Sequence, residues 1–290
     1  MSTFQTLYDL GLKLLTAPPD SDLGRLTLHH CRDRDEASEV LRKAVLQRTM
    51  PGEDSSTRWG ILRVFMRNLC NRAHAPMPAP EMLNLLDGIS SSVQDDLSRT
   101  EALEKAVANN ARLLPSLQAV LRKGYAPDGC DDYIEWLSKR IEEYRHKPVT
   151  DIDPDRVLSQ LRHMASDPKT EIPNMGIALA SNLFADLGIR VVGKPDLHVL
   201  PTVKGLRGAV RLTPESCIRE VIWMSQNEAP LVQDSGEFGW LDGGLYPRDV
   251  DRMIYLIGSD NFRLDGNRLT RCAPRRRVRM LDELMDVQQG

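Results

Sequence analysis

The chain has 290 residues, a net charge of −3, 41% hydrophobic and 27% charged residues, which is the composition of a globular protein with one large domain or two smaller ones. No apolar run approaches the roughly 18 residues of a membrane span, and residues 1–5 do not resemble a secretory signal, so we expect a cytoplasmic protein. The pI of about 6.1 argues mildly against a general nucleic-acid binder.

The N-terminal half has the apolar spacing of a series of amphipathic helices. The first helix stops at an Ala-Pro-Pro sequence, and the second begins acidic and ends basic, as the helix dipole favours. The pattern predicts helices over residues 4–16, 35–48, 56–73, about 100–123, and 131–146.

The C-terminal half combines further helices with one short hairpin. Helix start and stop signals predict helices over 153–165, 177–187, 213–226 and 246–258, the last ended by Gly258. The segment FRLDGNRLT, residues 262–270, predicts two short strands that turn on Asp265-Gly266. The sequence therefore predicts a mainly α protein.

Five cysteines are spread along the chain without any Cys-x-x-Cys pair. Their number is odd, and their spacing does not match a zinc site or an iron–sulfur cluster. We expect reduced, mostly buried thiols, no structural metal and no cofactor; the cysteines are Cys31, Cys70, Cys130, Cys217 and Cys272.

A tight turn, Ile172-Pro173-Asn174-Met175-Gly176, joins the helices predicted over 153–165 and 177–187. A turn this short leaves backbone amides pointing outward at a helix N-terminus, where the helix dipole also favours a phosphate. Asn174 suits it, because asparagine tolerates positive φ. Taken alone, the pattern fits a plain helix–turn–helix without a ligand at least as well.

A second element, Asp196-Leu197-His198-Val199, starts 20 residues after Gly176 (196 − 176). The hairpin, a helix ended by Gly188, a short connector and Asp-x-His-Val together resemble the helix-hairpin-helix superfamily of base-excision DNA glycosylases. The hairpin of that family reads roughly Leu-Pro-Gly-Val-Gly. The resemblance covers residues 171–199.

The resemblance implies a helix-hairpin-helix glycosylase-like helical fold and a monomer that acts on double-stranded DNA. We expect three regions: a long helical region (1–147), the hairpin and catalytic segment (148–212), and a helical region with a small β-hairpin (213–290). Phosphates of the DNA would be bound by the hairpin and by the basic residues that follow it, namely Pro173, Asn174, Met175, Gly176, Ile177, Ala178, Lys204, Arg207 and Arg211.

The same resemblance implies chemistry at Asp196. A carboxylate beside C1′ of a flipped nucleotide stabilises the oxocarbenium ion and orients or deprotonates the attacking water. Lys194 is expected at the surface, where it could contact a phosphate or partly neutralise Asp196, and His198 is expected to support the geometry. Pro201 departs from the family by interrupting the expected helix, which predicts a short or kinked turn.

Ala178 is the second departure. It replaces the lysine that forms a Schiff base in bifunctional members, so we expect a monofunctional enzyme that leaves an abasic site. The biological role would be DNA repair, or excision of modified bases from foreign DNA such as that of a virus.

Two other functions stay open: a non-catalytic helix-hairpin-helix DNA-binding module, and a helical scaffold that binds no nucleic acid. Arginines cluster over 271–279, where they either contact phosphate or form an ordinary solvated surface. The residues that could stack on a flipped base are Trp59, Trp136, Trp223, Trp240, Phe238 and Tyr246. We expect Trp59 and Trp223 to pack in the core. The glycine-rich loop over 235–244 is either a flexible loop that covers the site or an ordinary connector.

Overall fold

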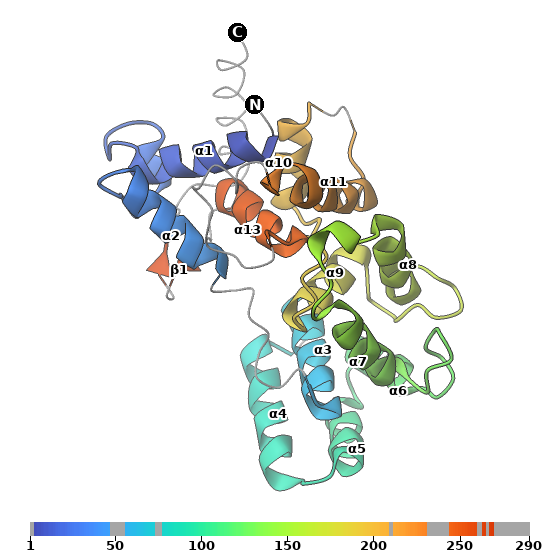
Figure 1. The fold of residues 1–290 in the computed structure, drawn as a ribbon. Helices are drawn as coiled ribbons and strands as arrows, with labels where there is room; N and C mark the ends of the chain where they lie inside the picture. Colours follow the sequence, from blue (N-terminus) through green and yellow to red (C-terminus); the bar gives the residue numbers. More distant parts are fainter. Residues whose placement is uncertain are drawn as a thin grey trace. The chain divides into compact units, whose positions relative to one another are not determined.

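A computed structural model describes residues 3–46, 56–72, 77–208, 211–230, 244–259, 263–264 and 267–269. These residues are mainly helical, as predicted (Figure 1). Within these ranges, no helix combines the length and apolarity needed to cross a membrane. The helices are α1 (Thr3–Thr16), α2 (Arg34–Leu46), α3 (Arg58–Arg72), α4 (Ala79–Ser92), α5 (Asp96–Val107), α6 (Leu113–Leu121), α7 (Tyr133–Tyr144), α8 (Pro154–Ala165), α9 (Ile177–Asp186), α10 (Val199–Leu206), α11 (Pro214–Asn227) and α13 (Pro247–Gly258), with 3-10 helices η1 (Gly24–Leu26) and η2 (Val149–Asp151).

The chain forms two compact units that interleave along the sequence. Unit 1 comprises residues 1–50, 148–154 and 190–290, and unit 2 comprises residues 51–147 and 155–189. This division differs from the three consecutive regions expected from the sequence, since both ends of the chain belong to unit 1. The hairpin 172–176 belongs to unit 2, and Asp196 belongs to unit 1.

Helix α13 lies at the centre of unit 1. It packs against α1, α2, α10 and α11 (Figure 1), and all its residues except Tyr255 are buried. Its apolar side joins one core with the N-terminal helices, formed among others by Phe4, Leu7, Val250, Met253 and Ile257. Burial of this apolar surface stabilises the unit, so residues near the start of the chain support the segment around Asp196.

The two strands of the predicted C-terminal hairpin are present. Strands β1 (Arg263–Leu264) and β2 (Asn267–Arg268) pair antiparallel, with Arg263 opposite Arg268 and Leu264 opposite Asn267. Leu269 follows β2 into the core of unit 1, and its carbonyl accepts a hydrogen bond from the Leu28 N–H at 2.9 Å.

Unit 2 is a bundle around α3, which packs against α4, α7 and α9. Three aromatic side chains line its interior. The ring centroids of Tyr133 and Trp136 lie 5.6 Å apart in an edge-on arrangement, and those of Trp136 and Phe184 lie 6.1 Å apart. Trp59 is buried, as expected for a core residue, and Trp136, which was considered as a base-stacking residue, is fully buried. Trp223 of unit 1 is 44% exposed, so the core packing expected for it was wrong.

The sequence prediction was wrong at two places in unit 2. The single helix predicted over 100–123 is two helices, α5 and α6, because Asn110 interrupts it and its Oδ1 accepts the Leu113 N–H at 3.1 Å, which caps α6. Helix α4 was not predicted, and it begins within the proline-rich residues 76–80. Proline is also favoured in the first turn of a helix, where Pro80 lies.

Four of the five cysteines, Cys31, Cys70, Cys130 and Cys217, are free and buried, as predicted. Cys272 lies outside the described residues, as do the Asp265-Gly266 turn, the arginine cluster over 271–279, Trp240 and Phe238. Most of the loop over 235–244 also lies outside them.

Candidate functional site

The hairpin of unit 2 connects α8 to α9 through a tight β-turn. The Met175 N–H donates to the Ile172 carbonyl at 3.0 Å, and Asn174 has a φ of 63°. Proline before a residue of positive φ is the signature of a type II turn. The helix–turn–helix and the left-handed conformation of Asn174 therefore agree with the sequence prediction.

Neighbouring parts of unit 2 hold this turn in place. Ser116 Oγ donates to the Pro173 carbonyl at 2.5 Å, and Asn174 Nδ2 donates to the Arg112 carbonyl at 3.1 Å. The Tyr125 hydroxyl donates to the Glu171 carbonyl at 2.7 Å. Because Met175 is buried as well, the turn is fixed on one side and exposed on the other at Pro173, Asn174 and Gly176.

Three consecutive amides at the start of α9 have no hydrogen-bond acceptor among the described residues: those of Gly176, Ile177 and Ala178. A Cβ placed on Gly176 would meet nothing within 4 Å. The amides are thus open to a ligand at the positive end of a helix, which is an arrangement suited to an anion.

Helix α9 ends as the sequence predicted. Gly188 has a φ of 83°, its N–H donates to the Ala185 carbonyl at 3.0 Å, and the Ile189 N–H donates to the Phe184 carbonyl at 2.8 Å. These two bonds form a Schellman motif, for which glycine is the preferred residue.

In unit 1, the connector that follows runs closely against α11 and α13. A Cβ on Gly193 would lie 2.8 Å from Val221 Cγ1 and 3.1 Å from Asp251 Cβ, so only glycine fits there without a shift. The next backbone N–H, that of Lys194, donates to Asp251 Oδ1 at 3.0 Å. The main chain before Asp196 is therefore fixed by packing and by a buried carboxylate.

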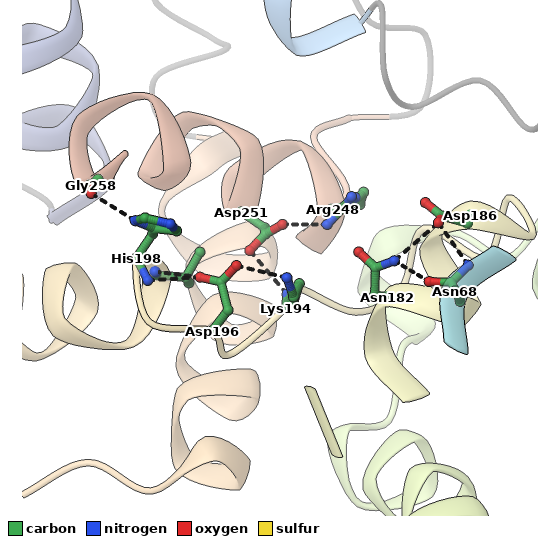
Figure 2. Close-up of polar contacts among 10 residues, drawn as sticks. Asn68, Asn182, Asp186, Lys194, Asp196, His198, Arg248, Asp251 and Gly258 are labelled. Carbon is green, nitrogen blue, oxygen red and sulfur yellow. Dashed lines mark hydrogen bonds and ion pairs between the residues drawn. The ribbon is translucent and has the colours of Figure 1, made fainter. Parts of the chain in front are cut away.

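Asp196 lies at the start of α10 and uses both carboxylate oxygens. Oδ1 accepts the backbone N–H groups of His198 at 2.9 Å and Val199 at 3.0 Å, and Oδ2 lies 2.9 Å from Lys194 Nζ (Figure 2). The side chain is 13% exposed. Helix α10 begins at Val199, and Pro201 is in its first turn, where no N–H donor is needed, so Pro201 does not interrupt this helix.

Lys194 is buried, with a side chain only 7% exposed, so its expected place at the surface was wrong. Lysine is almost never fully buried without a partner, and its partner here is Asp196. Of the two roles considered for Lys194, the structure contains the neutralising one.

His198 contacts the end of α13 through its ring. Its Nδ1 lies 3.3 Å from the Gly258 carbonyl oxygen, and its ring meets the Tyr255 ring edge-on at 5.3 Å. A Cβ on Gly258 would lie 2.5 Å from the His198 carbonyl oxygen. The end of α13 therefore packs directly on the start of α10.

Asp251 and Arg248 of α13 complete the cluster and were missed by the sequence analysis. Arg248 Nη1 lies 2.6 Å from Asp251 Oδ2, and both side chains are buried (Figure 2). Burial raises the pKa of Asp251 to about 7; Arg248 opposes the increase, and the negative charge of Asp196 adds to it. The available signal was a helix with charged residues, RDVDR, inside an otherwise apolar pattern.

The three basic residues expected to contact DNA differ in their surroundings. Lys204 and Arg211 are exposed and have no polar partner among the described residues. Arg207 instead pairs with Glu220 at 2.8 Å and Glu228 at 3.3 Å, and lies over the Trp223 ring at 4.4 Å. Its charge is therefore largely neutralised within unit 1.

The structure thus brings Lys194, Asp196 and His198 together in unit 1 and places residues 173–178 at one turn of unit 2. A separate polar cluster of unit 2 links Asn68, Asn182 and Asp186, with Asp186 Oδ2 at 2.9 Å from Asn68 Nδ2 and 3.0 Å from Asn182 Nδ2 (Figure 2). No group of three or more His, Cys, Asp or Glu side chains suited to a metal ion occurs in the described part of the chain.

Comparison of the chain with protein-family models, curated proteins and solved structures gives no match.

Proposed function

We propose that the protein is a monofunctional DNA glycosylase. It would bind double-stranded DNA as a monomer, flip a damaged or modified base out of the helix and hydrolyse its N-glycosidic bond. The observation that carries this proposal is the presence of two features separated by 20 residues along the sequence (196 − 176). They are a hairpin with three open amides and a carboxylate fixed at a helix start.

The chemistry assigns one task to each feature. The amides of Gly176, Ile177 and Ala178 bind phosphate oxygens without reading sequence, and Lys204 and Arg211 add positive charge. The Asp196 carboxylate stabilises positive charge on the sugar as the bond from C1′ to the base breaks, and a water oxygen then bonds to C1′. The bonding electrons leave with the base, which gains one proton, and the attacking water loses one, so the hydrolysis balances.

Lys194 has to change partner in this scheme. An ammonium 2.9 Å from Asp196 opposes the development of positive charge on the sugar. A DNA phosphate that attracts Lys194 would relieve this opposition and leave the Asp196 charge facing the sugar. Lys194 would then fill both roles considered for it, one in the free protein and one in the complex.

The product follows from Ala178. With no amine at this position, a Schiff base on the family's usual lysine cannot form, and the DNA strand should stay intact with an abasic site. Trapping of a covalent enzyme–DNA adduct with borohydride would contradict this and would indicate that another amine, such as Lys194, attacks C1′.

The experiment that tests the function is incubation with genomic DNAs that carry different damaged or modified bases, followed by mass spectrometry of the released bases. We expect free base from at least one DNA, and strand breaks only after alkali or heat. The identity of that base would separate a role in repair from excision of modified bases from foreign DNA. DNA binding without release of any base would contradict the proposal.

A non-catalytic helix-hairpin-helix DNA-binding module is the second candidate. It is favoured by the bonding of Asp196, because a carboxylate that caps α10 and pairs with Lys194 already has a structural role. A module of this kind would need the hairpin amides but not the charge of Asp196.

A scaffold that binds no nucleic acid would fail to bind duplex DNA in a filter-binding assay at low salt.

A further inference from the structure

Asp251 is a buried carboxylate with a partner on each oxygen. Its Oδ1 accepts the Lys194 N–H at 3.0 Å, its Oδ2 lies 2.6 Å from Arg248 Nη1, and its side chain is only 3% exposed. Figure 2 shows Asp251 between Arg248 and the Lys194–Asp196 pair. One contact of Asp251 therefore fixes the main chain two residues before Asp196.

On the basis of the glycosylase function proposed above, we propose that Asp251 is a positioning residue for Asp196. Asp251 holds the backbone of Lys194 so that Asp196 stays at the start of α10. Its negative charge also adds to that of Asp196 on the side where the sugar becomes positive. Asp251 does not touch the substrate. It acts through the position of the Lys194–Asp196 segment and through the electric field of its own charge.

The groups around Asp251 determine when it is charged. On α13 these are Arg248 and Arg252, on the connector Lys194 and Asp196, and on α11 the thiol of Cys217. Burial, together with the charges of Asp251 and Asp196, raises the pKa of Cys217 well above its usual range, so this thiol stays neutral. Since burial raises the pKa of Asp251 to about 7, its charge changes across neutral pH.

The direction of the effect on catalysis follows. As the pH falls through about 7, Asp251 becomes protonated, loses its charge and is a weaker acceptor for the Lys194 N–H. As the pH rises through about 7, the carboxylate ionises, forms charge-assisted bonds and strengthens the negative field at the sugar. Base release should therefore rise as the pH increases through about 7.

Asp249 provides a matched control on the same helix. It is fully buried, accepts the Tyr246 N–H at 2.9 Å and pairs with Arg190, and neither of these bonds involves the Lys194–Asp196 segment. Asp251→Asn and Asp249→Asn make the same chemical change at two buried carboxylates of one helix, although only one oxygen of Asp249 has a partner among the described residues. A general loss of packing should affect both variants alike.

The first measurement is single-turnover base release at saturating enzyme from pH 6 to 8. We expect the wild-type rate to rise with pH, Asp251→Asn to be about tenfold slower at pH 8 without that rise, and Asp249→Asn to stay within about twofold of wild type. A wild-type profile in Asp251→Asn, or an equal effect of both substitutions, would overturn the proposal.

The second measurement needs no activity: hydrogen exchange of the Lys194 amide in the free protein at pH 8, where Asp251 is mostly ionised. Because a charged acceptor binds more strongly than a neutral one, exchange should be about fivefold faster in Asp251→Asn and unchanged in Asp249→Asn. Unchanged exchange in Asp251→Asn would overturn the positioning role even if base is released. Faster exchange in a protein that releases no base would instead overturn the glycosylase function and, with it, the catalytic part of this proposal.

Discussion

At the scale of single residues, the structure separates charges that are free to meet a ligand from charges used inside the fold. Lys204 and Arg211 are exposed without a polar partner among the described residues, whereas Arg207 has two carboxylate partners and covers Trp223. Proximity in the sequence had grouped the three as DNA contacts. Their surroundings predict different consequences when each is removed.

Arg207→Ala and Lys204→Ala test this difference. Loss of Arg207 leaves Glu228 buried beside the Phe4 N–H without a counter-charge, so we expect destabilisation of about 1–3 kcal/mol. Lys204→Ala should leave stability within about 0.5 kcal/mol of wild type while weakening duplex binding and reducing its salt dependence. Urea unfolding and binding titrations at several salt concentrations measure both effects, and equal stabilities of the two variants would contradict the assignment.

At the scale of elements, the hairpin shows why a local turn could be predicted and a buried cluster could not. Pro173, Asn174 and Gly188 specify backbone conformations through their own chemistry, so their positions in the sequence were sufficient. Asp251 and Asp249 have partners 57 and 59 residues away along the chain, Lys194 and Arg190, and nothing in the local pattern names those partners. The break between α5 and α6 was missed because the apolar spacing continues past Asn110.

Gly176→Thr tests the hairpin without disturbing the fold. Gly176 has a φ of −94° and a ψ of 166°, a Cβ there meets nothing within 4 Å, and threonine is about as good as glycine at a helix N-cap. The added side chain would stand in front of the open amides, so we expect duplex affinity to fall about tenfold, or 1.4 kcal/mol.

The control for Gly176→Thr is its thermal stability, which should match that of the wild type. If affinity and its salt dependence are unchanged in a stable variant, the hairpin amides do not contact DNA. If affinity and stability fall together, the lower affinity results from a less stable fold and does not show that the hairpin contacts DNA.

At the scale of the whole molecule, the N-terminal helices are part of the unit that contains Asp196. Phe4 and Leu7 of α1 share a core with Val250 and Met253 of α13, and α13 holds Asp251 against the connector. The sequence predicted these helices individually but not their association, because contacts between the two ends of a chain leave no local periodicity.

Phe4→Ala should therefore affect the Asp196 segment from far along the sequence. Truncation of a fully buried phenylalanine costs about 3–5 kcal/mol, and we expect faster hydrogen exchange in α10 and α13 with a smaller change in α7 of unit 2. Faster exchange confined to α1 would show that the N-terminal helices do not support the site.

The most direct test of the central claim is single-turnover base release by Asp196→Asn, measured at saturating enzyme beside DNA affinity and stability. Asparagine caps a helix as well as aspartate, so α10 should persist, although Lys194 loses its counter-charge. We predict that base release falls by roughly 100-fold or more while duplex affinity holds or rises slightly, because the negative charge acts on the chemical step. Base release at the wild-type rate by a folded Asp196→Asn variant would contradict the assignment of Asp196 as the catalytic carboxylate.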